Sequence, residues 1–110
     1  MSCLAYFHEG VTMAVLNDKQ LKKLIEENNL VTGMIDPVTQ VQSNGVELTL
    51  QSIKLFVNHG KLAFDNSERI LPKYDDISFD KDGWRWLIPG SYLIQYNEIV
   101  NIPKDCCAFS

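Results

Sequence analysis

Hydrophobic and polar residues alternate along much of the chain after residue 33, and this spacing is typical of β-strands that bury one face. From Val46 the sequence reads Val-Glu-Leu-Thr-Leu, which places Glu47 on the polar, outward face. The same alternation predicts short strands at residues 46–50, 53–58, 61–64, 84–88, 91–96, 98–102 and 106–109. Turn pairs punctuate them: Asn44-Gly45, His59-Gly60, Asp82-Gly83 and Pro89-Gly90. Short strands without a second helical segment favour a mainly β sandwich, jelly roll or barrel over a parallel sheet.

One helix is predicted before these strands. Asn17 followed three residues later by Gln20 is a capping-box pattern, and Leu16 can pack onto Leu21 across the first turn. The Asn28-Asn29 pair is expected to end the helix, because asparagine tolerates the left-handed backbone that closes many helices. The sequence therefore predicts a single short N-terminal helix.

The residues expected to supply much of the core occupy apolar positions on this helix and on the strands: Leu21, Leu24, Ile25, Val46, Leu48, Leu50, Phe56, Leu62, Phe64, Leu93, Ile94 and Ile102. Residues 65–83 are polar and acidic, and we expect them to form a long loop. Trp84 and Trp86 share one face of the strand predicted at 84–88. Because no basic groove accompanies them, core or interface packing is favoured over stacking on bases.

Length and charge limit the possible classes of protein. The chain has 110 residues, which is the size of one domain, and its formal net charge is −4. A nucleic acid polymer is a poor partner, because affinity for it depends on clustered lysine and arginine. No apolar run approaches the roughly 18 residues that a membrane span requires. We therefore expect neither a nucleic acid polymer nor a membrane as a partner.

The opening residues, MSCLAYFHEGVT, lack the basic start and long apolar stretch of a secretory signal. A second methionine follows at Met13. Residues 1–12 are therefore expected to be a non-native or disordered leader, with the structured protein beginning near residue 13. The alternative is an extra edge strand through Leu4–Phe7.

The cysteines suggest no metal site. Cys3, Cys106 and Cys107, together with two histidines, match no zinc spacing, and adjacent cysteines rarely bridge each other. The simplest interpretation of Cys106-Cys107 is a strand in which one thiol packs inward as a small hydrophobic group. A reducing, cytoplasmic setting follows as the expected compartment.

Two segments resemble a known superfamily. Residues 13–50, MAVLNDKQLKKLIEENNLVTGMIDPVTQVQSNGVELTL, are similar to the start of the dUTPase and dCTP deaminase superfamily, a short helix and then an extended Gln-x-Gln-x-Asn/Ser-Gly/Ser-x-Asp-Leu stretch. Residues 87–110, LIPGSYLIQYNEIVNIPKDCCAFS, resemble a later part, with a Pro-Gly turn, a strand, an Asn-Glu hairpin and Ile-Pro. The Asn-Gly pair and the phrase YNEIVNIP are most similar to archaeal-type dUTPases. The resemblance implies a distorted jelly-roll or β-clip-like domain with one short N-terminal helix, and residues 13–110 would be the N-terminal part of that single domain.

The resemblance also assigns a role to Glu47. In dUTPases the acid at this position helps, through water, to hold the Mg²⁺ that carries the triphosphate, and the family pattern has aspartate there. Glutamate keeps the charge but reaches about 1.5 Å further, one carbon–carbon bond. A water-mediated contact tolerates that change better than a direct ligand, because Mg²⁺ demands short octahedral distances. The alternative is that Glu47 is an ordinary solvent-facing strand residue.

Beyond the Ile-Pro segment, the superfamily continues into an Arg-Ser-Ser-Leu phosphate motif, a base-accepting hairpin and a water-activating carboxylate. No residue of this chain matches them, so no catalytic residue is assigned, and the chain alone is expected to be inactive. The resemblance implies a homotrimeric hydrolase of nucleotide metabolism that splits dUTP to dUMP and pyrophosphate with Mg²⁺. Two alternatives remain: a dCTP deaminase-type enzyme acting on the deoxycytidine triphosphate, and a non-catalytic nucleotide-binding or assembly module.

Overall fold

A computed structural model gives the structure of the chain and describes residues 1–7 and 12–110, with the side chains of residues 1–2 and 14–110. The chain forms two compact units. The first unit comprises Met1–Thr49 and Tyr96–Ser110, and the second unit comprises Leu50–Gln95.

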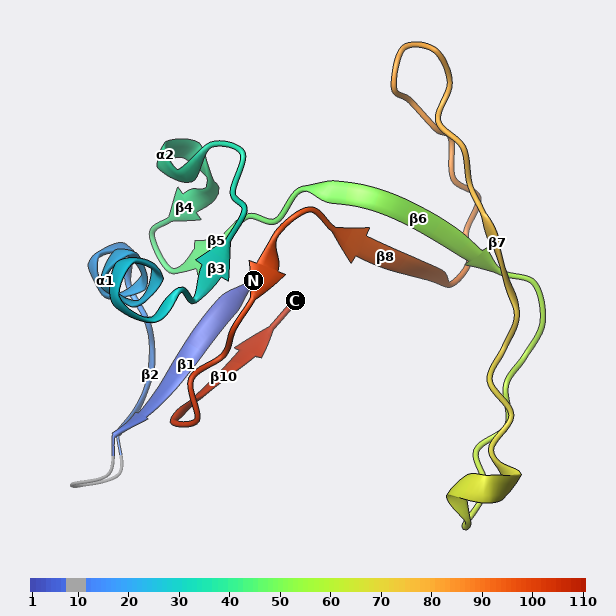
Figure 1. Cartoon of the computed structure of the whole chain (residues 1–110), viewed down its shortest axis with the longest axis horizontal. Coiled ribbons are helices and arrows are strands. Elements are labelled where there is room, and N and C mark those ends of the chain that lie inside the picture. Colours follow the sequence, from blue (N-terminus) through green and yellow to red (C-terminus); the bar gives the residue numbers. More distant parts are fainter. Residues whose placement is uncertain (8–11) are drawn as a thin grey trace. The chain divides into compact units, whose positions relative to one another are not determined.

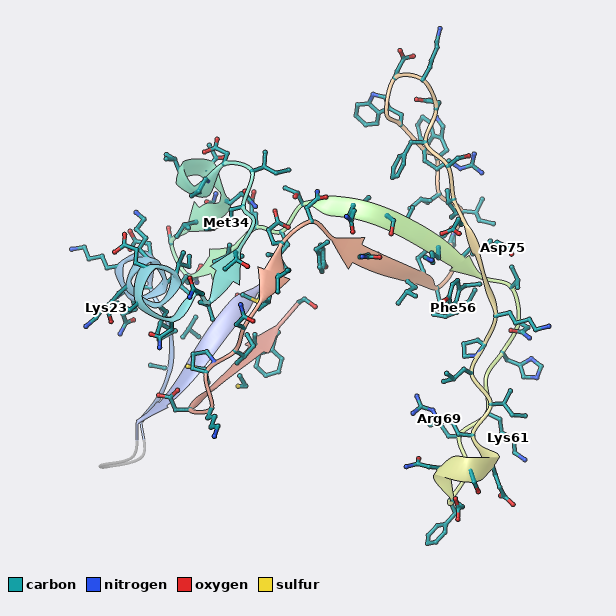
Figure 2. All side chains as sticks on the ribbon, viewed as in Figure 1. Lys23, Met34, Phe56, Lys61, Arg69 and Asp75 are labelled. Atoms are coloured by element: carbon teal, nitrogen blue, oxygen red, sulfur yellow. The ribbon has the colours of Figure 1, made fainter. Side chains whose placement is uncertain are left out.

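Helix α1 (Asp18–Asn28) begins and ends as its sequence predicts. The Asn17 side chain accepts a hydrogen bond from the Gln20 backbone N–H, and the Gln20 side chain accepts one from the Asn17 N–H, each over 3.0 Å. This reciprocal pair is the predicted capping box. Asn29 closes the helix in the left-handed conformation, with φ 53°. Lys23 lies on the exposed side of the helix (Figure 2).

The remaining elements of the first unit are short strands and one short helix. They are β1 (Ser2–Phe7), β2 (Thr12–Val15), β3 (Val31–Thr32), α2 (Pro37–Gln40), β4 (Val41–Gln42), β5 (Gly45–Val46), β9 (Ile99–Val100) and β10 (Cys106–Phe109). Three small sheets result, in the orders β10-β1-β2, β3-β9 and β4-β5 (Figure 1). All of these pairings are antiparallel. Strand β10 matches the prediction for residues 106–109.

Strand β1 occupies part of the predicted leader. Its backbone pairs with both β2 and β10, so the strand lies in the middle of its sheet. The structure therefore has the extra strand that was the alternative for Leu4–Phe7, although at the centre of a sheet rather than at an edge. Residues 8–11 lie outside the described residues. The native origin of residues 1–12 and the boundary at residue 13 remain predictions.

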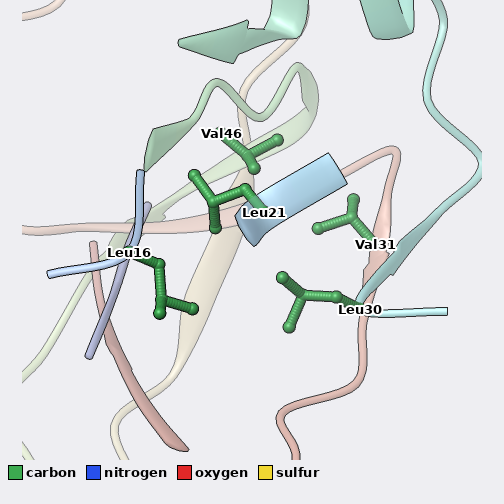
Figure 3. Close-up of a cluster of buried hydrophobic side chains, with 5 residues drawn as sticks. All are labelled: Leu16, Leu21, Leu30, Val31 and Val46. Atoms are coloured by element: carbon green, nitrogen blue, oxygen red, sulfur yellow. The ribbon is translucent and has the colours of Figure 1, made fainter. Parts of the chain in front are cut away.

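The core of the first unit is a cluster of aliphatic side chains between α1 and the strands (Figure 3): Leu16, Leu21, Leu30, Val31 and Val46. Leu21 and Val46 confirm the predicted core, and Leu16 joins Leu21 as the predicted packing across the first helical turn requires. Leu24, Ile25 and Leu48 pack against the cluster while only partly buried. Cys106 also packs against it, whereas Cys107 is exposed, as the inward-facing-thiol interpretation expects.

The second unit contains one sheet, in the order β7-β6-β8. Its elements are β6 (Leu50–Phe56), the 3₁₀ helix η1 (Asn66–Glu68), β7 (Tyr74–Asp76) and β8 (Tyr92–Tyr96), of which the last residue, Tyr96, belongs to the first unit. Strands β6 and β7 are antiparallel, and Phe56 pairs with Tyr74. Ile53 is the buried hydrophobic residue of this unit among those described. The second unit therefore buries far less apolar surface than the first.

Several predicted core residues are exposed, and the prediction for them is wrong: Leu50, Leu62, Phe64, Leu93, Ile94 and Ile102. Trp84 and Trp86 are exposed as well, so they do not fill a core in this structure. Alternation shows that one face of a strand is apolar, but it does not show which face another element covers. Phe56 is half-buried.

The strand predictions also need correction. Residues 84–88 form no strand, and 61–64 contribute only an isolated bridge between Lys61 and Ile70. The loop predicted at 65–83 contains η1 and β7. The predicted strand 46–50 is interrupted, because residues 47–49 are irregular between β5 and β6. A second helix, α2, also exists, since Asp36 caps it through the backbone N–H groups of Val38 and Thr39.

The fold class predicted from the sequence is confirmed at its general level, because the described residues form mainly strands with few helices. The jelly-roll or β-clip arrangement remains a prediction. No helix among the described residues is long and apolar enough to span a membrane.

Candidate functional site

Glu47 follows directly after a tight hairpin. Strands β4 and β5 pair so that Gln42 faces Gly45, which leaves Ser43 and Asn44 as the two turn residues. The turn is therefore one residue earlier than the predicted Asn44-Gly45 pair. Gly45 lies within β5, where an added Cβ would come within 2.8 Å of the Met1 carbonyl oxygen. Glu47 is exposed, as predicted, but it lies just beyond the strand rather than within it.

Gln40 anchors the backbone of Glu47. The Glu47 N–H donates to the Gln40 carbonyl over 2.8 Å, and Gln40 Nε2 donates to the Glu47 carbonyl over 2.9 Å. The Gln40 side-chain oxygen accepts from the Asp36 N–H over 2.8 Å. Gln40 is only 5% exposed, so these bonds are shielded from competing water. Both main-chain polar groups of Glu47, its N–H and its carbonyl, are thus hydrogen-bonded to Gln40.

Glu98 is a buried carboxylate, 6% exposed, that receives three neutral donors. Gln40 Nε2 donates to Oε1 over 2.7 Å, the Thr49 N–H donates to Oε2 over 2.8 Å, and the Thr49 hydroxyl donates to Oε1 over 2.6 Å. These lengths are typical of hydrogen bonds to an ionised acceptor. Burial raises the pKa of the Glu98 carboxyl, but the bonds from Thr49 and Gln40 outweigh that effect, and its pKa lies below the usual value.

Asn97 makes two further hydrogen bonds to Thr49. Its N–H donates to the Thr49 carbonyl over 3.0 Å, and its side-chain amide donates to the Thr49 hydroxyl over 2.9 Å. The Thr49 hydroxyl therefore donates to Glu98 and accepts from Asn97. The predicted Asn-Glu hairpin is wrong, because β8 pairs with β6 and β9 pairs with β3. Asn97 and Glu98 instead form a connection between two sheets.

A pocket of about 350 Å³ opens beside Glu47. Its lining residues all belong to the first unit: Met1, Glu47, Leu48, Tyr96 and Ser110. Glu47 and Leu48 come from the segment before Thr49, and Tyr96 comes from the segment before Glu98. The pocket therefore lies next to the polar network that joins those two segments.

The residues around this pocket could hold a Mg²⁺ ion through water molecules bound to a single carboxylate. No group of three or more His, Cys, Asp or Glu in the described part of the chain could hold a metal ion. Glu47 supplies the carboxylate side chain among the lining residues. Glu98 is not among them, and its oxygens already accept three hydrogen bonds. Mg²⁺ commonly keeps several waters and binds through one or two carboxylates together with substrate phosphates. A single exposed glutamate is consistent with such a water-rich site.

Sequence reasoning found Glu47 but missed the residues that hold it. Gln40 and Glu98 both occur in the segments that resemble the superfamily, yet no role was assigned to either. Buried amides and carboxylates are uncommon unless they are paired. The available signal was Glu98 itself, a charged residue directly before the β9 residues Ile99 and Val100. Its partner lies 58 positions away, and no local pattern connects the two.

Comparison with known proteins places the chain in a family. A family model described as dCTP deaminase-like matches residues 15–110, and the chain belongs to this family.

Curated relatives are similar over most of the chain. A protein of Methanococcoides burtonii is 48% identical over 99 residues, and one of Methanosarcina mazei is 46% identical over 99 residues; each match covers 89% of this chain and 58% of the relative. A protein of Archaeoglobus fulgidus is 37% identical over 98 residues, 89% of this chain and 57% of the relative. Each is named "Probable deoxyuridine 5'-triphosphate nucleotidohydrolase". The chain thus spans less than two thirds of these relatives. No solved structure matches it.

Proposed function

We propose that this chain is part of a dUTP diphosphatase, an enzyme that uses water to split dUTP into dUMP and pyrophosphate. The observation that carries the proposal is the agreement among the curated relatives, whose names all specify the deoxyuridine triphosphate. Their similarity covers 89% of this chain. The network around Glu47 supports it, because an exposed carboxylate on a firmly held backbone suits the binding of a metal–nucleotide complex.

Glu47 is the proposed magnesium-site residue. When bound, Mg²⁺ supplies positive charge that neutralises the triphosphate and orients it. Glu47 would hold water molecules of the ion's hydration shell rather than the ion itself, which suits the extra methylene of glutamate. The chain's own contribution is to present one carboxylate at the edge of a small pocket and to keep its backbone fixed.

The same proposal includes the oligomeric state of the protein and its cellular compartment. Resemblance to the superfamily supports a homotrimer with active sites shared between subunits. The Cys106 side chain packs against the aliphatic cluster and Cys107 is exposed. A reducing, cytoplasmic setting is part of the proposal.

A dCTP deaminase is the second candidate, because the matching family model carries that description. That reaction uses water to replace the amino group of the cytosine base, releasing ammonia and forming dUTP. The two reactions differ in the bond that breaks, a phosphoanhydride in one and a carbon–nitrogen bond in the other.

The test uses the protein extended to the length of its relatives. It is supplied with Mg²⁺ and either dUTP or dCTP, and pyrophosphate and ammonia are measured separately. Pyrophosphate from dUTP without ammonia from dCTP is the expected result. Ammonia from dCTP alone would establish the deaminase, and neither product together with tight nucleotide binding would favour the non-catalytic module.

A further inference from the structure

The two segments that line the Glu47 pocket are joined by a set of hydrogen bonds behind it. Thr49 follows the Glu47-Leu48 side, and Asn97 and Glu98 follow Tyr96 on the other side. Four bonds link Thr49 to Asn97 and Glu98, and a fifth links Glu98 to Gln40. These hydrogen bonds hold the two sides of the pocket together.

The amide of Gln40 has only one orientation that satisfies its neighbours. Its oxygen accepts from the Asp36 N–H, and its nitrogen donates both hydrogens, one to Glu98 and one to the Glu47 carbonyl. Rotating the amide by half a turn would direct the oxygen at the Glu98 carboxylate and the Glu47 carbonyl, both of which are acceptors. The Asp36 N–H, the Glu47 carbonyl and the Glu98 carboxylate all favour this orientation of the Gln40 amide, and Glu98 is the charged partner among the three.

We propose that Gln40 and Glu98 are positioning residues for Glu47: the Glu98 carboxylate orients the Gln40 amide, and that amide fixes the Glu47 backbone at the edge of the pocket. This inference rests on the proposed function, in which Glu47 contacts the magnesium–dUTP complex. Neither Gln40 nor Glu98 needs to touch the nucleotide, because both are buried. Their effect on binding is transmitted through one hydrogen bond to the Glu47 carbonyl.

An exchange of the two side chains separates positioning from simple stabilisation. Gln40→Glu removes both donors and places a second carboxylate against Glu98, so it should reduce both stability and affinity. In the double variant Gln40→Glu/Glu98→Gln, the new amide at position 98 can donate to the new carboxylate at position 40. The buried pair is then restored, but the carboxylate cannot donate to the Glu47 carbonyl. Stability should recover only in part, because the new carboxylate still faces the Glu47 carbonyl oxygen, and the positioning of Glu47 should not recover.

The matched control is Gln42→Glu. It makes the same chemical change two residues away, where the Gln42 side chain is exposed and donates to the Thr39 carbonyl over 2.7 Å. It touches neither Glu47 nor Glu98 in the described contacts. An effect common to both variants would come from the added charge alone.

The experiment measures thermal stability and affinity for dUTP at fixed Mg²⁺ in the full-length parent, Gln40→Glu, the double variant and the control. Residues that orient a metal's ligands typically change affinity by about 10–100-fold when altered. A loss of that size is expected in the double variant, although its stability should exceed that of Gln40→Glu. The control should keep the parent affinity. Parent-like affinity in the double variant would overturn the inference.

A second measurement tests the positioning role of Gln40 and Glu98 separately from the proposed dUTP diphosphatase function. The NMR signals and hydrogen exchange of the Glu47 amide are recorded without nucleotide in the same proteins. They should change in the double variant and stay unchanged in the control. If the parent binds no dUTP, the proposed function fails, and the Glu47 signals still decide the positioning role. Identical Glu47 signals in the parent and the double variant would contradict that role.

Discussion

The Thr49 hydroxyl donates a 2.6 Å hydrogen bond to the Glu98 carboxylate, and these two residues lie 49 positions apart. Thr49 ends the first segment of the first unit, and Glu98 lies near the start of the second segment. The residues between them include the whole of the second unit. This contact therefore joins two separate parts of the chain into one compact unit, beside the pocket that Glu47 lines.

Removing the Thr49 hydroxyl should destabilise the first unit. Thr49→Val keeps the size of the side chain but deprives the buried Glu98 carboxylate of one donor, and a loss of about 1–3 kcal/mol in the free energy of unfolding is expected. Thr39→Val is the control, because the Thr39 hydroxyl is exposed and its bond to the Asp36 carbonyl is 3.4 Å long. Chemical denaturation measures both. Equal losses in the two variants would show that the Thr49–Glu98 bond contributes little.

Stability should depend on pH through Glu98. Its pKa is lowered in the folded state, so its contribution is fully present above the ordinary glutamate pKa of about 4.3. That contribution is lost as the pH falls through the lowered pKa. The difference in free energy of unfolding between the parent and Glu98→Gln should therefore be largest near neutral pH and narrow in acid.

Urea denaturation at several pH values from neutral down to about pH 3 measures this difference. The exposed carboxylates of Asp36 and Asp65 also have lowered pKa values, but they are present in both proteins and their effects cancel in the comparison. A difference that stays constant across the range would mean that the Glu98 charge does not contribute to stability.

Leu21 should be the most sensitive of the predicted core positions. It is 0% exposed at the centre of the aliphatic cluster, and Leu21→Ala is expected to cost about 2–5 kcal/mol. Ile35→Ala is the matched control, because Ile35 is 70% exposed in the same unit and surface changes usually move stability by less than about 0.5 kcal/mol. A small loss at Leu21, seen in chemical denaturation, would place the core of this unit elsewhere.

The parts of the fold that the sequence predicts correctly depend on neighbouring residues. The capping box of Asn17 and Gln20 is decided within one helical turn, and so is the left-handed cap at Asn29. Strand β10 is signalled by its own alternation. Leu62 and Phe64 fit an alternating pattern equally well, yet both are exposed. Burial requires a covering element, and the sequence pattern of a strand contains no information about that element.

The residues of the candidate site also differ in whether the local sequence indicates them. The alternation after the Asn-Gly pair predicts that Glu47 faces outward, and the resemblance to dUTPases assigns its metal role, but neither predicts that it lies one residue beyond the strand. Gln40 and Glu98 were missed because their importance arises from contact with each other across 58 positions. Hydrogen bonds between distant residues follow from tertiary structure, and the period of hydrophobic residues does not reveal them.

The measurement that tests the central claim most directly is the affinity for dUTP at several Mg²⁺ concentrations in the protein extended to the length of its relatives. Three forms are compared: the parent, Glu47→Gln and Glu47→Asp. Glu47→Gln is nearly isosteric but uncharged, so it should keep the fold and lose Mg²⁺-dependent affinity. Glu47→Asp keeps the charge and should retain or improve that affinity. The same Mg²⁺ dependence in all three forms would contradict the magnesium-site account and leave Glu47 as an ordinary exposed residue.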